Sequence, residues 1–332
     1  MQSGINVRPV RRRVLAGMFA LGAGASLLAV GAVSAQEQFP SETINVVTHA
    51  GPGGGTDITT RMMMLRGRRE LGQDMVVVSK TGGSGSAALQ YLKSVECDGH
   101  TIMTLTQSHL LQIAQGKVPV TIDEVVGLAR ATLDPQLIAV RADSDIQTLD
   151  DLIEKSKATE GGLKWGTTFV GGTDHIAIHN FTKATGGIPY TVVPFEGGGD
   201  IVTNLVGGDV QVGILNYAEG EAQLNAGELR PVAVLAEERI DSLPDTPTAK
   251  EQGVDAEAST IRGFVTLSCV PEERLKVLEE GLVAAMNHGV YQNYITGSGM
   301  PKDSVVGREE WTAQIRQLYD ESESALKDLG ML

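Results

Sequence analysis

The stretch INVVTHAGPGGGTD, residues 44–57, decides the fold class of this chain. Its first five residues form an apolar, β-branched run with the length of a buried strand. A glycine-rich turn follows, and from Ile58 to Leu71 apolar side chains recur at helical spacing until Gly72 ends the pattern. A buried strand that leads through a glycine-rich loop into a helix is typical of an α/β protein with a parallel sheet.

The same alternation of strand-like and helical segments continues along the chain and restarts near residue 148. No tandem repeat or low-complexity region interrupts it, so we expect an α/β fold throughout. Predicted helices are 58–71, 87–95, 149–158, 173–184, 200–206, 217–226, 272–287, a short one near Tyr291, and 308–328; predicted strands are 44–48, 75–78, 101–105, two within 127–140, 163–166, 191–193, 210–215, 230–235 and 263–269.

The first 35 residues have the organisation of an export signal. Four arginines and no acidic side chain lie within residues 1–13, an uncharged stretch runs from 14 to 33, and Val33-Ser34-Ala35 supplies the small residues of a cleavage site. The three arginines at 11–13 also fit a twin-arginine signal, so the Sec and twin-arginine routes both stay open. A retained transmembrane helix is the alternative. The richness in Gly and Ala favours cleavage after Ala35 and a periplasmic protein.

The net charge of the chain limits the classes of partner that it can bind. It carries 27 basic and 41 acidic side chains, a net charge of −14, and without the signal the net charge becomes −18. Nucleic acid and anionic membranes attract positive surfaces, so neither is expected as a partner. A small anionic ligand stays possible because local dipoles in a cleft can hold it. The length that remains after the signal suggests two domains.

The two cysteines, Cys97 and Cys269, lie far apart in the sequence. Export makes a disulfide between them possible. Their spacing lacks the paired pattern of a zinc site. The sequence leaves a bridge and two buried thiols both open.

Glycine-rich segments that end in aspartate occur three times. Residues 53–57, 171–174 and 197–200 each follow a predicted strand and open a predicted helix. Aspartate is a preferred N-cap, and glycine lets backbone amides approach a ligand. Helix N-termini attract anions, and in a parallel sheet they gather at the carboxyl ends of the strands. The three loops predict a shared anion site, with short structural connections as the alternative.

Signatures of several enzyme classes are missing. Residues 51–57 lack the Gly-Lys-Ser/Thr ending of a P-loop and do not fit the dinucleotide fingerprint, and no G-x-S-x-G elbow is present. His175 and His179 are four residues apart, as in a two-histidine metal site, but the glutamate of the zinc-protease motif is absent. We therefore expect no metal, no cofactor and no catalytic residue.

A set of motifs along the mature chain resembles one known family, the receptors of tripartite tricarboxylate transporters (Bug-type binding proteins). The resemblance runs in order through almost all of the mature chain. It implies a two-lobed "Venus flytrap" of type II periplasmic-binding-protein topology, each lobe a mainly parallel sheet flanked by helices, without catalytic activity. The motifs are FPSETI (39–44), GPGGGTD (51–57), CDGHTI (97–102), WGTT (165–168) with His175, VPFEG (193–197), NLVGGDV (204–210) and LPDTPT (243–248).

In this family the ligand carboxylate is held largely by loop amides, hydroxyls and bridging waters. If the amides of Gly53–Gly55 hold the carboxylate, the site needs no arginine, which suits an acidic chain. The segments 167–170, Glu196 and 270–271 depart from the family pattern and leave the identity of the ligand open. The implied ligand-binding residues are Gly53, Gly54, Gly55, Thr56, Asp57, Ser108, His109, Thr167, Thr168, Gly171, Thr173, Asp174, Gly197, Gly198, Asn216 and Tyr217; Thr56, Asp57 and Asp174 have helix capping as an alternative role.

The sequence interpretation is a monomeric periplasmic receptor that delivers a di-/tricarboxylate or aromatic acid to a tripartite tricarboxylate-type transporter. We expect lobe 1 to comprise residues 37–141 and 264–332, and lobe 2 residues 142–263. An exported α/β enzyme acting through His109 or His175, and a sensory protein that signals to a membrane kinase, are the alternatives.

Overall fold

The computed structural model describes residues 39–53, 55–168, 170–195 and 197–332. The predicted signal peptide, with its cleavage point at Ala35, lies outside the described residues, as do Gly54, Phe169 and Glu196. Within the described part, none of the helices combines the length and apolarity that a membrane span requires.

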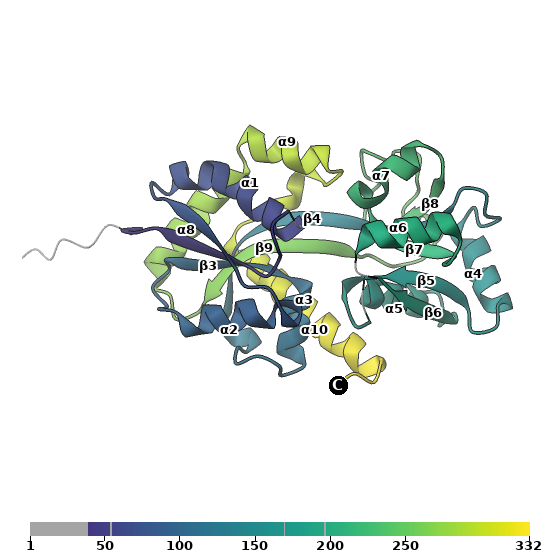
Figure 1. Ribbon diagram of the computed structural model, residues 1–332, viewed down its shortest axis with the longest axis horizontal. Coiled ribbons are helices and arrows are strands. Elements are labelled where there is room, and N and C mark those ends of the chain that lie inside the picture. Colours follow the sequence, from purple (N-terminus) through teal and green to yellow (C-terminus); the bar gives the residue numbers. More distant parts are fainter. Residues whose placement is uncertain (1–38, 54, 169, 196) are drawn as a thin grey trace, which may run out of the picture. The chain divides into compact units, whose positions relative to one another are not determined.

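Lobe 1 is built from the N-terminal strands and helices together with the C-terminal helices (Figure 1). Strands β2, β1 and β3 run parallel, as predicted from the alternation of strands and helices. Short 3₁₀ helices are labelled η. The elements are β1 (Ile44–Thr48), α1 (Gly55–Glu70), β2 (Met75–Ser79), η1 (Gly83–Gly85), α2 (Ser86–Ser94), β3 (Thr101–Thr106), α3 (Gln107–Ala114), η2 (Ile122–Glu124), α8 (Glu272–Met286), α9 (Gly289–Gly297), η4 (Lys302–Ser304) and α10 (Arg308–Asp328).

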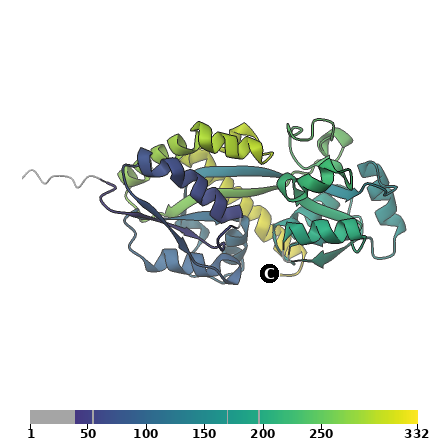
Figure 2. The ribbon, with the colours of Figure 1, turned by 45° about the horizontal axis from the view of Figure 1, so that its top comes forward.

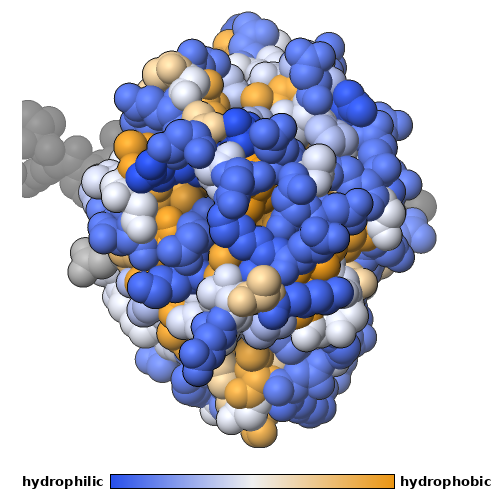
Figure 3. All heavy atoms as spheres, turned by 90° about the vertical axis from the view of Figure 1, so that its right-hand side faces the viewer, coloured by the Kyte–Doolittle hydropathy of each residue, from blue (hydrophilic) through white to orange (hydrophobic). Residues whose placement is uncertain are grey.

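Lobe 2 repeats the arrangement with a second set of parallel strands. Strand β5 lies between β6 and β7 and is parallel to both. The face of this lobe that carries α4 is covered mainly by hydrophilic side chains, as expected for an acidic chain (Figure 3). The elements are α4 (Leu149–Ala158), β5 (Leu163–Thr167), α5 (Thr173–Ala184), β6 (Tyr190–Pro194), α6 (Gly198–Gly207), β7 (Val212–Asn216), α7 (Tyr217–Asn225), β8 (Leu229–Val234) and η3 (Lys250–Gln252).

Two long antiparallel strands cross between the lobes, β4 (Val125–Arg141) and β9 (Ser259–Leu267) (Figures 1 and 2). The sequence predicted two strands within 127–140, but β4 is one strand of 17 residues. The hydrogen-bonded pairing of β4 with β9 continues past two register shifts. The polar residues in the middle of β4 therefore stay part of the strand. Because β4 also pairs with β7 and β8, it links the sheets of both lobes. Since β4 belongs to the sheets of both lobes, the lobe boundaries predicted from the sequence stay a prediction.

Helices cover both faces of each sheet, and each lobe has its own apolar core. In lobe 1, Met63 and Met64 of α1 pack with α8 and α9 on one face, and Trp311 of α10 lies on the other. Met62 is partly buried against the same core, so the three consecutive methionines of α1 serve packing. In lobe 2, Trp165 and Phe181 are fully buried, with ring centroids 5.7 Å apart. Covered parallel sheets of this kind place the starts of several helices at the carboxyl edge of the strands.

Cys97 and Cys269 form a disulfide in the structure. Cys97 lies between α2 and β3, and Cys269 follows the end of β9. The loop that the bridge closes spans 172 residues and contains all of lobe 2. The bridge therefore joins the strand that returns from lobe 2 to the base of lobe 1.

Candidate functional site

The first glycine-rich loop leads into α1, which begins at Gly55. Asp57 is nearly fully buried, and its Oδ2 accepts a hydrogen bond from the backbone N–H of Gly53 at 2.9 Å. The same carboxylate pairs with Arg61, and this hydrogen bond is the main reason that the pKa of Asp57 is lowered. Asp57 thus lies in the first helical turn, not at the N-cap as predicted. One of the three amides proposed for the ligand, that of Gly53, is already bonded within the loop.

The second glycine-rich loop opens α5, whose N-cap is Gly172. Asp174 again lies inside the first turn and not at the cap. Its carboxylate accepts the backbone N–H of Thr168 at 3.0 Å and the side-chain amide of Gln136 at 2.7 Å. Burial raises the pKa of Asp174. The bond from Gln136 ties the start of α5 to the crossing strand β4.

The third loop opens α6, and its N-cap is Gly197. Gly198 lies against Glu219 of α7: a Cβ at this position would be 2.2 Å from the carboxyl carbon. Glu219 accepts the backbone N–H of Asn216 at 2.9 Å, which closes the capping box of α7. Burial, with the nearby charge of Asp174, raises the pKa of Glu219. The starts of α5, α6 and α7 therefore meet in lobe 2.

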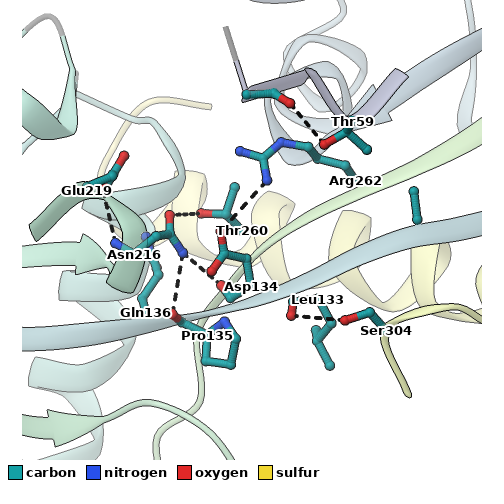
Figure 4. A network of polar contacts seen from close by, with 12 residues as sticks. Thr59, Leu133, Asp134, Pro135, Gln136, Asn216, Glu219, Thr260, Arg262 and Ser304 are labelled. Carbon is teal, nitrogen blue, oxygen red and sulfur yellow. Dashed lines mark hydrogen bonds and ion pairs between the residues drawn. The ribbon is translucent and has the colours of Figure 1, made fainter. Parts of the chain in front are cut away.

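Asn216 connects this group to the crossing strands (Figure 4). Its Nδ2 donates to the backbone oxygen of Asp134 on β4 at 2.9 Å, and its Oδ1 accepts from Thr260 on β9 at 2.8 Å. The side-chain amide of Asn216, a predicted ligand-site residue, is thus bonded to both crossing strands, and its contact with a ligand stays a prediction. The ring of Tyr217 packs beside Gly299, and its hydroxyl donates a hydrogen bond to Glu221 at 3.3 Å.

Arg262 is a residue of this region that the sequence interpretation missed. It lies on β9 in the crossing segment, and its Nη1 is 3.9 Å from Oδ2 of Asp134 (Figure 4). A Cβ on Gly55 would lie 2.9 Å from Nη2, so the guanidinium lies against the first turn of α1. The predicted strand began at 263, one residue too late to include it. The sequence did contain a signal for this residue, because Arg262 is the one charged side chain in the otherwise uncharged segment 258–271.

Asp134 is the carboxylate partner of Arg262. Its residue is 8 % exposed, and burial raises its pKa to about 7 against the opposing effect of the guanidinium. Arg262, Asp134 and Thr260 share one face of the crossing ribbon. This face links the start of α1 in lobe 1 to the starts of α5, α6 and α7 in lobe 2. The structure therefore brings together all three glycine-rich helix starts that the sequence singled out.

Ser108 and His109 lie at the start of α3 and act locally. His109 is fully buried, and its Nδ1 accepts the backbone N–H of Thr106 at 3.0 Å. Burial, together with the neighbouring His49, holds the pKa of His109 well below its usual value. Ser108 shares a hydrogen bond of 2.8 Å with the hydroxyl of Thr106. Both side chains complete the cap of α3.

The other predicted site residues are more scattered. Thr56 and Thr167 are buried at the ends of their elements, and Gly171 donates its N–H to Nδ1 of His175 at 2.9 Å. Thr173 lines a cavity of about 170 Å³ bordered by α3, α5 and α10. The lining of this cavity includes neither Arg262 nor Asp134, so it is separate from the polar face of the ribbon.

One group of side chains within the described residues has the composition of a metal site: Glu42, Asp98 and His100. Nδ1 of His100 lies 2.6 Å from the carboxylate of Asp98, and Nε2 accepts the backbone N–H of Ser41 at 3.2 Å. Both ring nitrogens therefore have partners. The geometry describes a hydrogen-bonded histidine at the base of lobe 1.

Comparison with known proteins agrees with the two-lobed fold. The sequence model of the tripartite tricarboxylate transporter family receptors matches residues 59–325. Protein BugT of Bordetella pertussis is 26 % identical over 228 residues, covering 68 % of this chain and 70 % of that protein.

Solved structures give the same result. A TctC solute-binding protein from Polaromonas, solved without ligand, superposes with a TM-score of 0.78 at 25 % identity, covering 88 % of this chain and all of the other. A protein of R. palustris, solved with adipate, has a TM-score of 0.74 at 23 % identity, covering 88 % and 99 % of the two chains. Because the family match spans most of the sequence, this chain belongs to the tripartite tricarboxylate transporter receptor family.

Proposed function

We propose that this chain is an exported solute-binding receptor that captures a small carboxylate between its two lobes and delivers it to a tripartite tricarboxylate-type transporter. The family supports the binding role, and the related protein from R. palustris was solved with a dicarboxylate. The arrangement that carries the proposal is the meeting of α1, α5 and α6 starts around the crossing ribbon. Helix N-termini from both lobes present amides and partial positive charge to an anion placed between them.

Two crossing strands fit a receptor that closes by a hinge. The lobes have separate cores, and β4 and β9 run continuously between them. A ligand that contacts helix starts of both lobes stabilises the closed arrangement more than the open one. Closure would then signal occupancy to the transporter.

The enzymatic alternative has weaker support. Nδ1 of both His109 and His175 accepts a backbone N–H, and burial lowers the pKa of each ring. Neither ring offers the exposed, near-neutral base that general acid–base catalysis uses. Reproducible turnover of a bound acid would reverse this choice.

The export signal leads to a first prediction. Protein recovered from the periplasm is expected to begin at Gln36 or within a residue or two of it, because Val33-Ser34-Ala35 has the small residues that signal peptidase requires. Intact-mass measurement and N-terminal sequencing check the position. Protein that begins at Met1 and stays in the membrane fraction would contradict it.

The ligand site leads to a second prediction. Gly55→Val is expected to weaken carboxylate binding tenfold or more, about 1.4 kcal/mol, because its side chain would enter the space between α1 and Arg262. Isothermal titration calorimetry with succinate, adipate, citrate and benzoate measures the affinities. The neutral diamide of a dicarboxylate that binds should bind much more weakly, because the helix dipoles lose their charge partner.

Gly297→Val is the matched control. Like Gly55, Gly297 is an exposed helical glycine, but it lies at the end of α9 and a Cβ there would meet no atom within 4 Å. Both variants replace a helical glycine by the same β-branched residue, so a difference in affinity reports the position of the substitution. Equal affinity of the folded Gly55→Val variant and the wild type would place the ligand elsewhere.

A further inference from the structure

The buried and half-buried arginines of this chain differ in how their donors are used. Arg130 donates to the backbone oxygens of Ser304 and Asp303 and to Oε1 of Gln314, at 2.7–2.9 Å. Arg230 likewise donates to three backbone oxygens, those of residues 142, 144 and 146. These two arginines are structural, since each guanidinium is surrounded by acceptors that the fold supplies.

Arg262 has no such acceptors in the described part of the chain. Its side chain is 16 % exposed, and within residues 39–53, 55–168, 170–195 and 197–332 it forms no hydrogen bond. Its Nε is buried without a partner, and so is the hydroxyl of Thr132, the residue directly opposite on β4. The ion pair of Arg262 with Asp134 is at 3.9 Å, beyond hydrogen-bond distance.

An unsatisfied guanidinium in this position is unfavourable for two reasons. Its Nε–H is buried without an acceptor, and such a donor costs about 1–3 kcal/mol. In addition, the group lies against the first turn of α1, where the helix dipole is also positive. Asp57, which could balance that end of the helix, is bonded to Arg61 and Gly53. Both effects are relieved by an anion.

We propose that Arg262 binds a carboxylate of the ligand and selects for anionic solutes, with Asp134 as the internal anion that the ligand displaces. This inference rests on the proposed receptor function and deepens it. A planar guanidinium can hold a carboxylate through two parallel hydrogen bonds, which gives orientation as well as charge. A neutral solute of the same shape would leave those donors unpaired.

Asp134 makes the affinity depend on pH. The groups that face it are Arg262 from β9, and Asn216 and Glu219 from the start of α7; its pKa is raised to about 7. Below that pH Asp134 is neutral and no longer competes for the guanidinium. The affinity for an acid that stays ionised should therefore rise as the pH falls from 8 to 6. His49, also near Arg262, has its pKa lowered to about 4 and stays neutral in this range.

The test uses full-length mature protein and calorimetry with succinate, adipate, citrate and benzoate. For the acid that binds most tightly, Arg262→Gln should lower affinity ten- to a hundredfold, because a hydrogen-bonded charge partner is lost. Arg262→Lys should recover part of this, since it keeps the charge and loses the planar fork. Asp134→Asn should raise the affinity at pH 8 and flatten the pH profile.

Arg316→Gln is the charge-matched control, because Arg316 pairs with Asp123 on the surface of α10. It should bind like the wild type. Unchanged affinity in folded Arg262→Gln overturns the inference while the receptor function stands; should that variant not fold, an unchanged pH profile in Asp134→Asn overturns it equally. If the wild type binds none of the acids, the proposed function fails and the inference fails with it.

Discussion

Replacing both Cys97 and Cys269 by serine is expected to lower the free energy of unfolding by roughly 3–5 kcal/mol. The bridge closes a loop of 172 residues, so it restricts a large part of the unfolded chain. The loop includes lobe 2 and both crossing strands, and without the bridge the return of β9 to lobe 1 depends on pairing and packing alone. Equilibrium unfolding in guanidinium chloride, followed by circular dichroism, measures the loss.

The single variants Cys97→Ser and Cys269→Ser are the controls. Each breaks the bridge as well as the double variant does, so all three should unfold at similar denaturant concentrations. The disulfide lies at the base of lobe 1, beyond the end of β9, whereas Arg262 lies in the crossing segment of that strand. Carboxylate affinity should therefore stay the same at temperatures where the variants are folded. A double variant with the midpoint and slope of the wild type would show that the bridge contributes nothing to stability.

Trp311→Ala is expected to cost about 3–5 kcal/mol, the range for removing a large aromatic residue from a core. Trp311 is fully buried, and its Nε1 donates to the backbone oxygen of Phe264 at 3.2 Å. The ring fills the space above Gly127 and Gly263, where a Cβ would lie within 2.7 Å of its atoms. Truncation therefore leaves a cavity between α10 and the crossing ribbon.

Trp311→Phe separates the contributions of ring volume and hydrogen bond. It keeps most of the packing and should cost much less than the alanine variant. Trp165 remains as the one tryptophan in both variants, so its fluorescence reports the unfolding of lobe 2 directly. If the free energy of unfolding of the alanine variant lies within about 1 kcal/mol of the wild-type value, the packing of Trp311 against the crossing ribbon does not contribute to stability as proposed.

Local patterns were sufficient to predict most helices and strands. The predicted helix 87–95 corresponds to α2 at Ser86–Ser94. The predicted helix 149–158 is confirmed as α4, where Thr148 is the N-cap and accepts the N–H of Asp151 at 3.2 Å. Errors arose where tertiary pairing overrides the local pattern. Residues 130–135 carry polar side chains that interrupt an apolar run, yet pairing with β9 extends β4 through them.

The site was predictable only in part. The three glycine-rich helix starts are visible as short motifs, because a strand, a tight loop and a first helical turn are all local. The aspartates were assigned to the wrong position, since the N-caps of α5 and α6 are glycines. The carboxylates of Asp57 and Asp174 accept hydrogen bonds from loop amides. Which amides stay available to a ligand depends on those bonds, and they form only in the folded loop.

By itself, the sequence determined the α/β class, the family and the positions of the helix starts, because these depend on short-range periodicity and on ordered motifs. Only the tertiary structure decided that Arg262 lies beside Asp134 and against Gly55. Their positions, 262, 134 and 55, are too far apart for any local pattern to connect them. The antiparallel register of β4 and β9 places the two charges on one face of the ribbon, and burial there gives them their electrostatic effect.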